Sequence, residues 1–397
     1  MNADSFGAFY QEELVAFRKD AYRFGKRHPE MADSLGLHWG DSPDPMVERL
    51  IEATAWFAAR IRRDSEAGMP FAAQQILGRI HPHFTRPVPS MGIASLTPND
   101  GFADAHPAGR ILPAGARFHC AGAGGGVIHW RTGSPILLNG AKVISHDFGE
   151  TKRPDGIVGG HSLSLVVENI RAMPSLRLFP WGNPFTTHPL HQWVHANALD
   201  VRIGEAGCPD GKRISLGRDA IQPGGLSPEE LALPRDSFAH PAYQLLQEYF
   251  VCPDRFLFWD IDLSRCAERR ERMEIAILLR LPPPDGVRAD LVRFDACAVP
   301  MVNLFETLAE PVLVDHTRHS WPLESNRADP DASEVHSILE VEAIQPGGGS
   351  FVIPRHGADG GGDGKTKWRW YGRRRRRMTG YGSDVELFFK SPDAEDF

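Results

Sequence analysis

Three closely spaced histidines are the first candidates in this chain for a chemical site. His188, His191 and His195 stand at H-x2-H-x3-H, a spacing that could bring the imidazoles to one face of a helix. Because imidazole is a common zinc ligand, the cluster would suit a metal-dependent hydrolase. No cysteine or carboxylate stands nearby at ligand spacing, so the alternative is three polar or half-buried histidines on an interaction helix. We expect no metal and no other cofactor.

A second chemical possibility lies in the five consecutive arginines Arg373–Arg377. Basic and aromatic residues alternate just before them, over 365–371, and this mixture is typical of nucleic-acid binding. The alternatives are a solvated loop between two strands and a patch for an acidic protein partner. Since 51 acidic residues against 44 basic ones give a formal net charge of −7, a basic field over the whole protein is excluded. We therefore expect no nucleic-acid partner.

The composition points away from secretion and from the membrane. The five cysteines are scattered and never form a C-x-x-C pair, which is typical of reduced thiols in a cytosolic protein. Charged residues interrupt the apolar positions of 1–24, so we expect no signal peptide, and no window resembles a membrane span. The motifs G-x-S-x-G and H-E-x-x-H do not occur in the sequence. We expect a cytoplasmic protein that is not an enzyme and that makes no direct membrane insertion.

The first ninety residues have the period of amphipathic helices. An apolar stripe at spacings of 3 and 4 runs from Tyr10 to Phe24, and His28-Pro29 ends that helix. A second helix begins at Asp44-Pro45, where an acidic N-cap precedes proline at the first helical position. A third, shorter helix is predicted over 71–80. Two strong amphipathic helices cannot close a core alone, so they require the rest of the chain or a partner.

After Pro89 the apolar period changes from 3.6 to 2. Alternation is clear over 163–167 and 275–281 and less clean over 256–261. Later candidate strands lie at 338–344 and 385–389. Helices are expected to interrupt the strands at 187–199 and 241–250. Glycine and proline, 39 and 32 residues, supply many turns, and many short strands with few helices between them predict antiparallel sheets.

These patterns predict an α+β fold with an N-terminal helical segment followed by β-rich domains of short, mostly antiparallel strands. We divide the chain into a helical region (1–89), a β-rich middle domain with short helices (90–300) and a β-rich C-terminal domain (301–397).

Six motifs, read in chain order, resemble the TssF family of type VI secretion baseplate subunits, also called ImpG or VasA. They are FYQEEL at 9–14, DPMVERLIE at 44–52, IHPHF with PVPSM at 80–91, LPAGA at 112–116, HPAYQLLQEYF with FLF at 240–258, and PMVNLF at 300–305. Two positions depart from the family pattern, since Cys252 replaces an aromatic residue and Ala116 replaces threonine. Family members are generally longer, so we expect the C-terminal domain to be incomplete relative to the family.

The resemblance implies a structural protein of a contractile injection system, without a catalytic site or cofactor. In that family the subunit pairs with TssG in the baseplate wedge on which the tail sheath assembles. A second TssF copy, TssK, TssE and the spike protein are its neighbours, and the assembly lies at the cytoplasmic face of the inner membrane.

Within this interpretation we expect two contact regions. The first is the apolar face of the first two helices, which would enter a bundle with TssG and a second TssF copy. Its residues are Leu14, Phe17, Phe24, Leu50, Phe57 and Ile61. The alternative is that this face packs on the chain's own β body. The second region is the aromatic segment of 243–250, for which a place in the core is the favoured interpretation and an interface the alternative.

Overall fold

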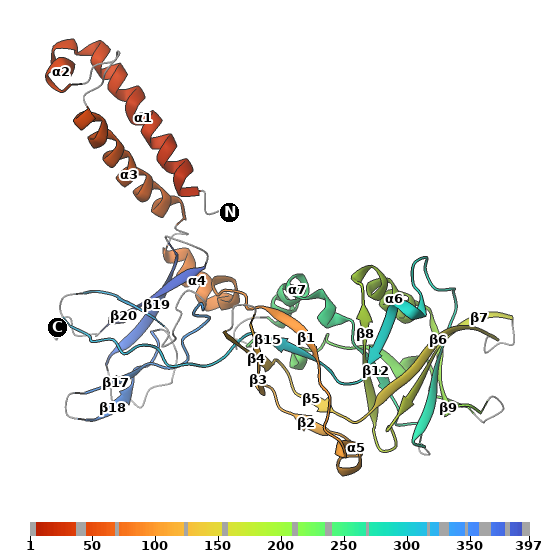
Figure 1. The fold of residues 1–397 in the computed structure, drawn as a ribbon. Helices are drawn as coiled ribbons and strands as arrows, with labels where there is room; N and C mark the ends of the chain where they lie inside the picture. The colour runs from red at the N-terminus through yellow and green to blue at the C-terminus, as the bar shows by residue number, and fades with distance from the viewer. Residues whose placement is uncertain are drawn as a thin grey trace. The chain divides into compact units, whose positions relative to one another are not determined.

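The fold combines N-terminal helices with several small antiparallel sheets in the computed structural model of the chain (Figure 1). The structure describes residues 5–36, 45–67, 71–122, 126–152, 158–208, 213–234, 240–266, 270–315, 318–324, 333–345, 348–356, 367–377 and 382–390. Over these residues the fold is α+β, as the sequence predicted. None of the described helices has an apolar stretch long enough to cross a membrane.

The chain divides into two compact units. One unit is Val88–Glu306, and the other combines Met1–Pro87 with Thr307–Phe397. The first unit begins and ends on neighbouring strands, because β1 (Met91–Ser95) pairs antiparallel with β15 (Ala298–Val302). The Asn303 amide also donates to the Ser90 carbonyl at 2.8 Å. Three domains at 1–89, 90–300 and 301–397 remain a proposal.

The N-terminal helices begin and end where the proline signals predicted. Helix α1 (Ser5–Arg27) ends just before His28-Pro29, and α3 (Pro45–Ala67) begins at Pro45, although its predicted cap Asp44 lies outside the described residues. Helix α4 (Phe71–Ile80) matches the third predicted helix. The short helices α2 (Pro29–Ser34) and η1 (Pro82–Thr85) complete this region.

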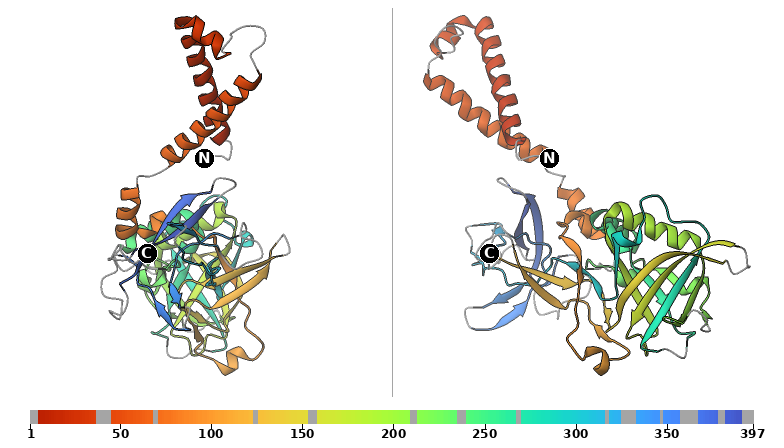
Figure 2. Two further views of the ribbon diagram at one scale, coloured as in Figure 1. Left: turned by 90° about the vertical axis from the view of Figure 1, so that its left-hand side faces the viewer. Right: turned by 45° about the vertical axis from the view of Figure 1, so that its right-hand side comes forward.

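Two sheets of Val88–Glu306 contribute to the largest core. Their strands are coloured from yellow through green to cyan in Figure 2. The five-stranded sheet has the order β10-β9-β13-β7-β6, with β6 (Lys142–Lys152), β7 (Val158–Glu168), β9 (Ala198–Glu205), β10 (Ile214–Ser215) and β13 (Arg272–Leu279). The second has the order β11-β12-β8-β14, with β8 (Ser175–Gly182), β11 (Ile221–Pro223), β12 (Trp259–Asp262) and β14 (Val292–Asp295).

The predicted alternation in β7 is confirmed, because Leu163, Leu165 and Val167 are fully buried. Helix α6 (Pro184–Asn197) adds Trp193 and its neighbours to the same core.

The remaining sheets are smaller. In Val88–Glu306, β1-β15-β4-β3 forms one sheet and β2-β5 another. Their further members are β2 (Arg110–Leu112), β3 (Arg117–Ala121), β4 (Val127–Thr132) and β5 (Ile136–Leu138). In the other unit the sheets are β16-β20-β19 and β17-β18. Their strands are β16 (Trp321–Pro322), β17 (Glu342–Ile344), β18 (Ser350–Val352), β19 (Arg369–Arg376) and β20 (Ser383–Lys390). Neighbouring small sheets share small cores, one around Val299 and Met301 and another around Trp370 and Leu387.

Two of the strand predictions are only partly right. Phe256 lies in the 3-10 helix η4 (Pro253–Phe256), because Pro253 and the buried Arg255 form a turn before strand β12 begins. The segment predicted over 338–344 is a strand only in β17, at its end. The other short helices are α5 (Phe102–Ala105), η2 (Arg218–Ala220), η3 (Pro228–Glu230) and η5 (Ala289–Leu291), and α7 (Pro241–Val251) matches its prediction closely.

Candidate interaction surfaces

The three histidines of α6 serve as structural side chains. His191 Nδ1 accepts a hydrogen bond from Trp259 Nε1 at 2.8 Å, and His188 Nε2 lies 3.2 Å from Asp254 Oδ1. The His195 ring packs on His191 with their centroids 4.4 Å apart. Burial lowers the pKa of His191 and of His195 to about 4, so both are neutral at pH 7.

This geometry gives the hydrolase alternative no support. Among the residues that the structure describes, no group of three His, Cys, Asp or Glu side chains could hold a metal ion. The hydrogen bond from Trp259 occupies the Nδ1 of His191, one of the ring nitrogens that a metal would need. The cluster therefore matches the alternative hypothesis of half-buried histidines on a helix.

Acidic residues of the neighbouring strand partly neutralise the arginine run Arg373–Arg377, which begins in β19. Arg375 Nη1 lies 3.4 Å from Glu386 Oε1, and Arg377 Nε lies 2.9 Å from Asp384 Oδ1. The side chain of Arg376 lies outside the described part of the chain. The run is thus part of a mixed-charge sheet, where each basic patch is weakened by nearby carboxylates.

Arg374 and Trp370 belong to the packed side of β19. Arg374 Nη2 donates to the carbonyl oxygens of Val335 at 2.6 Å and His336 at 3.0 Å, and burial lowers the pKa of Arg374 while its guanidinium stays charged. Trp370 is only 6% exposed and packs in the small core of this unit. The buried indole of Trp370 cannot stack on a base, so this residue gives the nucleic-acid alternative no support.

Helices α1 and α3 form a hairpin with a narrow seam (Figure 1). Its buried residues are small or few: Leu14 on α1 faces a seam to which α3 contributes Ala55 and Ala59, both fully buried. Ion pairs flank the seam. Arg18 Nε donates to Glu48 Oε1 at 2.8 Å, and Arg62 Nη1 lies 3.0 Å from Glu13 Oε1. The alanines let the helix backbones approach closely, and the charged pairs join α1 to α3 at the edge of the seam.

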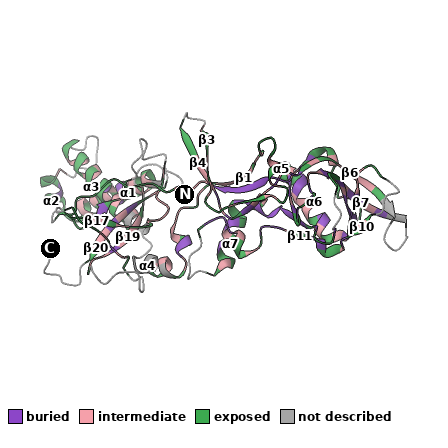
Figure 3. Cartoon of the chain, turned by 90° about the horizontal axis from the view of Figure 1, so that it is seen from below, coloured by how far each residue is buried: buried purple, intermediate pink, exposed green. Residues whose placement is uncertain are grey.

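The six residues expected at an interface divide between that seam and the solvent. Leu14 is buried inside the hairpin, while Phe17 and Phe24 are half-buried. Leu50, Phe57 and Ile61 are 67%, 60% and 70% exposed, and with Met46 they form the outer stripe of α3 at spacings of 4, 7 and 4. Much of α3 is accordingly coloured as exposed in Figure 3. The most regular apolar face of α3 therefore lies outside the hairpin seam.

Helix α7 is amphipathic, but it buries its polar face and exposes its apolar face. Its buried side chains are the polar pair Gln244 and Glu248, which are 5% and 0% exposed. Leu246 is 55% and Phe250 is 77% exposed, so the favoured sequence interpretation of this segment as core is wrong. Periodicity correctly placed these residues on one helix face, but that face is turned outward.

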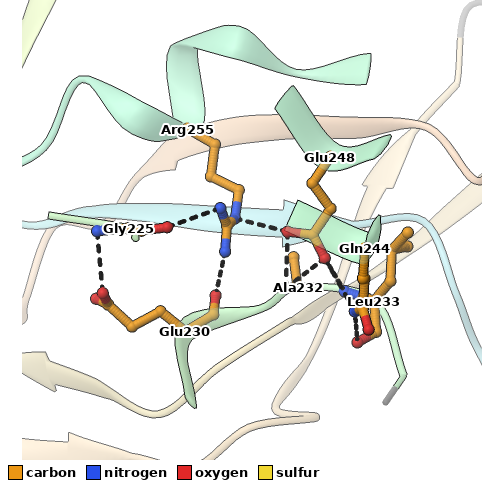
Figure 4. Close-up of polar contacts among 7 residues, drawn as sticks. All are labelled: Gly225, Glu230, Ala232, Leu233, Gln244, Glu248 and Arg255. Carbon is orange, nitrogen blue, oxygen red and sulfur yellow. Dashed lines mark hydrogen bonds and ion pairs between the residues drawn. The ribbon is translucent and has the colours of Figure 1, made fainter. Parts of the chain in front are cut away.

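A buried ion pair fixes the polar side of α7 (Figure 4). Arg255 Nε lies 3.0 Å from Glu248 Oε2, and both side chains are at most 1% exposed. Glu248 Oε1 accepts hydrogen bonds from the amides of Ala232 at 3.0 Å and Leu233 at 2.9 Å, and from Gln244 Nε2 at 3.1 Å. A carboxylate with this many donors and a guanidinium beside it is stable in the interior, because its charge is paired and its oxygens accept hydrogen bonds.

The same arginine holds the loop that precedes α7. Arg255 donates to the Gly225 carbonyl at 3.0 Å and to the Glu230 carbonyl at 2.5 Å, and the Gly225 amide donates to Glu230 Oε2 at 3.0 Å. Gly225 has a φ of +85°, and a Cβ there would lie 2.8 Å from the Arg255 carbonyl oxygen. At Gly133 a Cβ would lie 2.2 Å from the Cα of Ala232. Glycine is required at both positions because backbone lies in the space of a side chain.

A second arginine continues the network toward the four-stranded sheet. Arg177 on β8 lies 2.6 Å from Asp260 Oδ1 on β12 and also forms an ion pair with Glu230. Burial alone would lower the pKa of Arg177, but Asp260 and Glu230 together raise it above its usual range. The network from Arg177 to Glu248 therefore ties α7 and its preceding loop to the sheet.

Sequence reasoning missed this network, although a signal was present. Gln244 and Glu248 stand at i and i+4, on the side opposite Leu246 and Phe250, and Arg255 follows seven residues later. An acidic and an amide residue with an arginine so close could have indicated a buried pair. A buried charge is rare enough that the pattern favoured the opposite orientation.

A family model and a curated relative both match most of the chain, and both are named TssF. A model of the family described as "Type VI secretion system, TssF" matches residues 2–396. The protein "Type VI secretion system component TssF1" of Pseudomonas aeruginosa is 28% identical over 367 residues, which are 84% of this chain and 56% of that protein.

A solved structure gives the same result for the fold. A chain of the "type VI secretion system TssK-TssF-TssG baseplate subcomplex", determined by cryo-electron microscopy, has a TM-score of 0.69 and 23% sequence identity. The match covers 86% of this chain and 65% of that one. The chain spans less than two thirds of the length of either relative.

Proposed function

The chain belongs to the TssF family of the type VI secretion system, and from this premise we propose that it is a structural subunit of the baseplate. The family match over residues 2–396 is the observation that carries the proposal. In this role the protein contributes surfaces, and its buried polar groups hold those surfaces in place. Catalysis forms no part of the proposal.

The proposed partners follow from the solved relative, whose complex contains proteins called TssK and TssG. We extend these two partners to this chain. A second copy of the chain, TssE and the spike protein are further neighbours in the proposal, in keeping with the family resemblance. The proposed location is the cytoplasm, at the cytoplasmic face of the inner membrane when the baseplate is assembled.

The outer stripe of α3 is the proposed site of the helical bundle with TssG and a second copy. All four of its residues are at least 60% exposed, and none of them is buried in the seam with α1. Burying one such side chain stabilises a complex by about 1.5–3 kcal/mol. Leu14, Phe17 and Phe24 support the bundle differently, because they shape the hairpin that presents the stripe.

Exposure makes this proposal testable without unfolding the hairpin. In the variant Leu50→Glu/Phe57→Glu, both new charges lie in solvent in the free chain, so its helical circular dichroism should match the wild type. Co-purification with TssG should fall at least tenfold, because two desolvated carboxylates oppose the bundle. Wild-type yield of the complex from this variant would contradict the bundle.

The matched control is Leu339→Glu, which places the same charge at a 71% exposed leucine outside the hairpin. It should leave co-purification unchanged. Leu14→Glu provides the opposite control, because a charge in the seam should reduce both the helical signal and the yield.

A further inference from the structure

Helix α7 is held by its polar side and presents its apolar side to solvent. Gln244 and Glu248 face inward, whereas Leu246 and Phe250 face outward with exposures of 55% and 77%. Tyr243 and Tyr249 flank them, at 47% and 49%. Together these four residues form what we call the α7 stripe. Simple burial of apolar surface would favour the opposite rotation of the helix.

The buried contacts leave the helix no freedom to rotate. Turning Leu246 and Phe250 inward would pull Glu248 away from Arg255 and from the amides of Ala232 and Leu233. Such a movement would leave a charge and several donors buried without partners, which costs more than a leucine and a phenylalanine would gain. The network therefore specifies an outward-facing apolar stripe.

The stripe is also rigid and uncharged. The ring of Tyr249 packs against the buried Phe256 at 5.5 Å and against Phe250 at 5.9 Å between centroids. Glu248 is the single charged residue in 241–251, and it is buried. Ordered aromatic side chains lose little conformational entropy on binding. A partner that put charges against this surface would desolvate them without compensation.

The size and shape of the stripe select the kind of partner. On about 200 Å² per aromatic side chain, the exposed fractions of the three aromatic residues amount to about 350 Å², and the half-exposed Leu246 adds a smaller area. A stable interface between two globular copies buries about 800 Å² on each side, so this stripe is too small for one. It follows about two turns of a single helix, and such a ridge packs into the groove of another helix.

We propose that the α7 stripe is a docking site for one amphipathic helix of a partner subunit, with an apolar, uncharged contact face. The inference rests on the proposed function, because the partner belongs to the baseplate assembly. It adds a contact separate from the bundle of the N-terminal hairpin.

The test replaces Phe250 by the photoreactive amino acid p-benzoylphenylalanine in the complex of this chain with its TssG- and TssK-family subunits. Irradiation followed by mass spectrometry identifies the residues that contact position 250. Adducts within a helical segment of a partner are the expected result. A second arm uses Leu246→Glu/Phe250→Glu, which should lower recovery of that partner at least tenfold while the free chain melts at an unchanged temperature.

Ile111→Glu is the matched control, since Ile111 is 69% exposed on strand β2 of the same unit and should not affect recovery. The inference would be overturned by adducts to a loop or strand, or by adducts to this chain itself. It would also be overturned if position 250 gave no more adducts than the same reagent at position 111. The proposed function would stand in each of these cases. Failure of the wild-type chain to form the complex would overturn the proposed function, and the inference with it.

Discussion

The N-terminal hairpin and helix α7 both expose apolar side chains, but opposite means fix their orientation. In the hairpin, small buried residues such as Ala55 and Ala59 form the seam, and the ion pairs lie at its margins. In α7 the ion pair of Glu248 and Arg255 is itself the buried contact. The first arrangement lets two helix backbones approach, whereas the second dictates a single rotation of one helix.

The two regions show two ways in which an apolar helix face can stay exposed to solvent. A hairpin with a narrow seam has more apolar surface than it can bury, so part of that surface is left over. Helix α7 instead turns polar groups toward the interior. Burying these groups without hydrogen-bond partners would be costly. Exposed apolar residues of the two regions thus have different causes, and the following substitutions separate them.

The largest effect should come from Glu248→Ala, which breaks the polar anchor of α7. Arg255 would stay buried without its carboxylate, and two backbone amides would lose their acceptor. We expect the free energy of unfolding to fall by about 3–5 kcal/mol, measured by urea denaturation. The control Glu271→Ala removes an exposed pair with Arg171 and should cost less than about 1 kcal/mol. Equal effects of the two substitutions would contradict the claim that the buried pair of α7 stabilises the chain more than an exposed pair does.

A smaller and local effect should come from Ala59→Leu in the hairpin seam. The added methylenes force α1 and α3 apart, which typically costs about 1–3 kcal/mol. Amide hydrogen exchange should rise within α1 and α3 and stay unchanged in α7. Ala53→Leu makes the same change at an exposed position of α3 and should be nearly neutral. Faster exchange in α7 as well would show that the two regions are not independent.

The neutral histidines of α6 form a third kind of buried contact, and lowering the pH tests how much they contribute to stability. His191 and His195 have a pKa of about 4 in the folded chain against 6.5 when unfolded, so the unfolded state binds more protons. Stability should be complete above about pH 6.5 and should fall toward pH 4, by at most about 3 kcal/mol per histidine, since both rings are only half-buried.

Urea denaturation across this pH range tests the expectation, and His195→Gln should flatten the profile. A variant profile as steep as that of the wild type would assign the acid sensitivity to other groups.

The smallest effect should come from Arg18→Ala, at the margin of the hairpin. The side chain of Arg18 is 42% exposed and its partner Glu48 is 26% exposed. We expect a loss of less than about 1 kcal/mol, which high salt should reduce further. Thermal unfolding at low and high salt measures both. A loss as large as that of Glu248→Ala would mean that the pair, and not the alanine seam, holds the hairpin.

Much of the fold followed from local rules. Proline fixed the end of α1 and the start of α3, and alternation identified β7 and β13, because these signals depend on neighbouring residues alone. The turn at Phe256 could not be predicted in the same way. Its apolar residues continue a strand pattern, but the long-range contacts of Arg255 hold the backbone in a 3-10 helix.

The interaction surfaces were predicted less well, for a physical reason. Periodicity shows which residues share a helix face but not which face is buried. In α3 the small residues Ala55 and Ala59 form the seam and the outer stripe stays exposed. In α7 the deciding partners, Arg255 and the amides of Ala232 and Leu233, lie elsewhere in the sequence. Their contribution appears only once the chain is folded.

The pairing of β1 with β15 has a consequence for the order of events at the ribosome. Every described strand of Val88–Glu306 has been synthesised once β15 has emerged from the ribosome. This unit can therefore fold while the chain is still growing. The other unit must wait for Thr307–Phe397, whose synthesis takes about 5 to 20 s at typical rates. During this interval its first part, Met1–Pro87, exists without its second. The apolar stripe of α3 is then a nascent surface that a chaperone or an early-arriving partner subunit can bind.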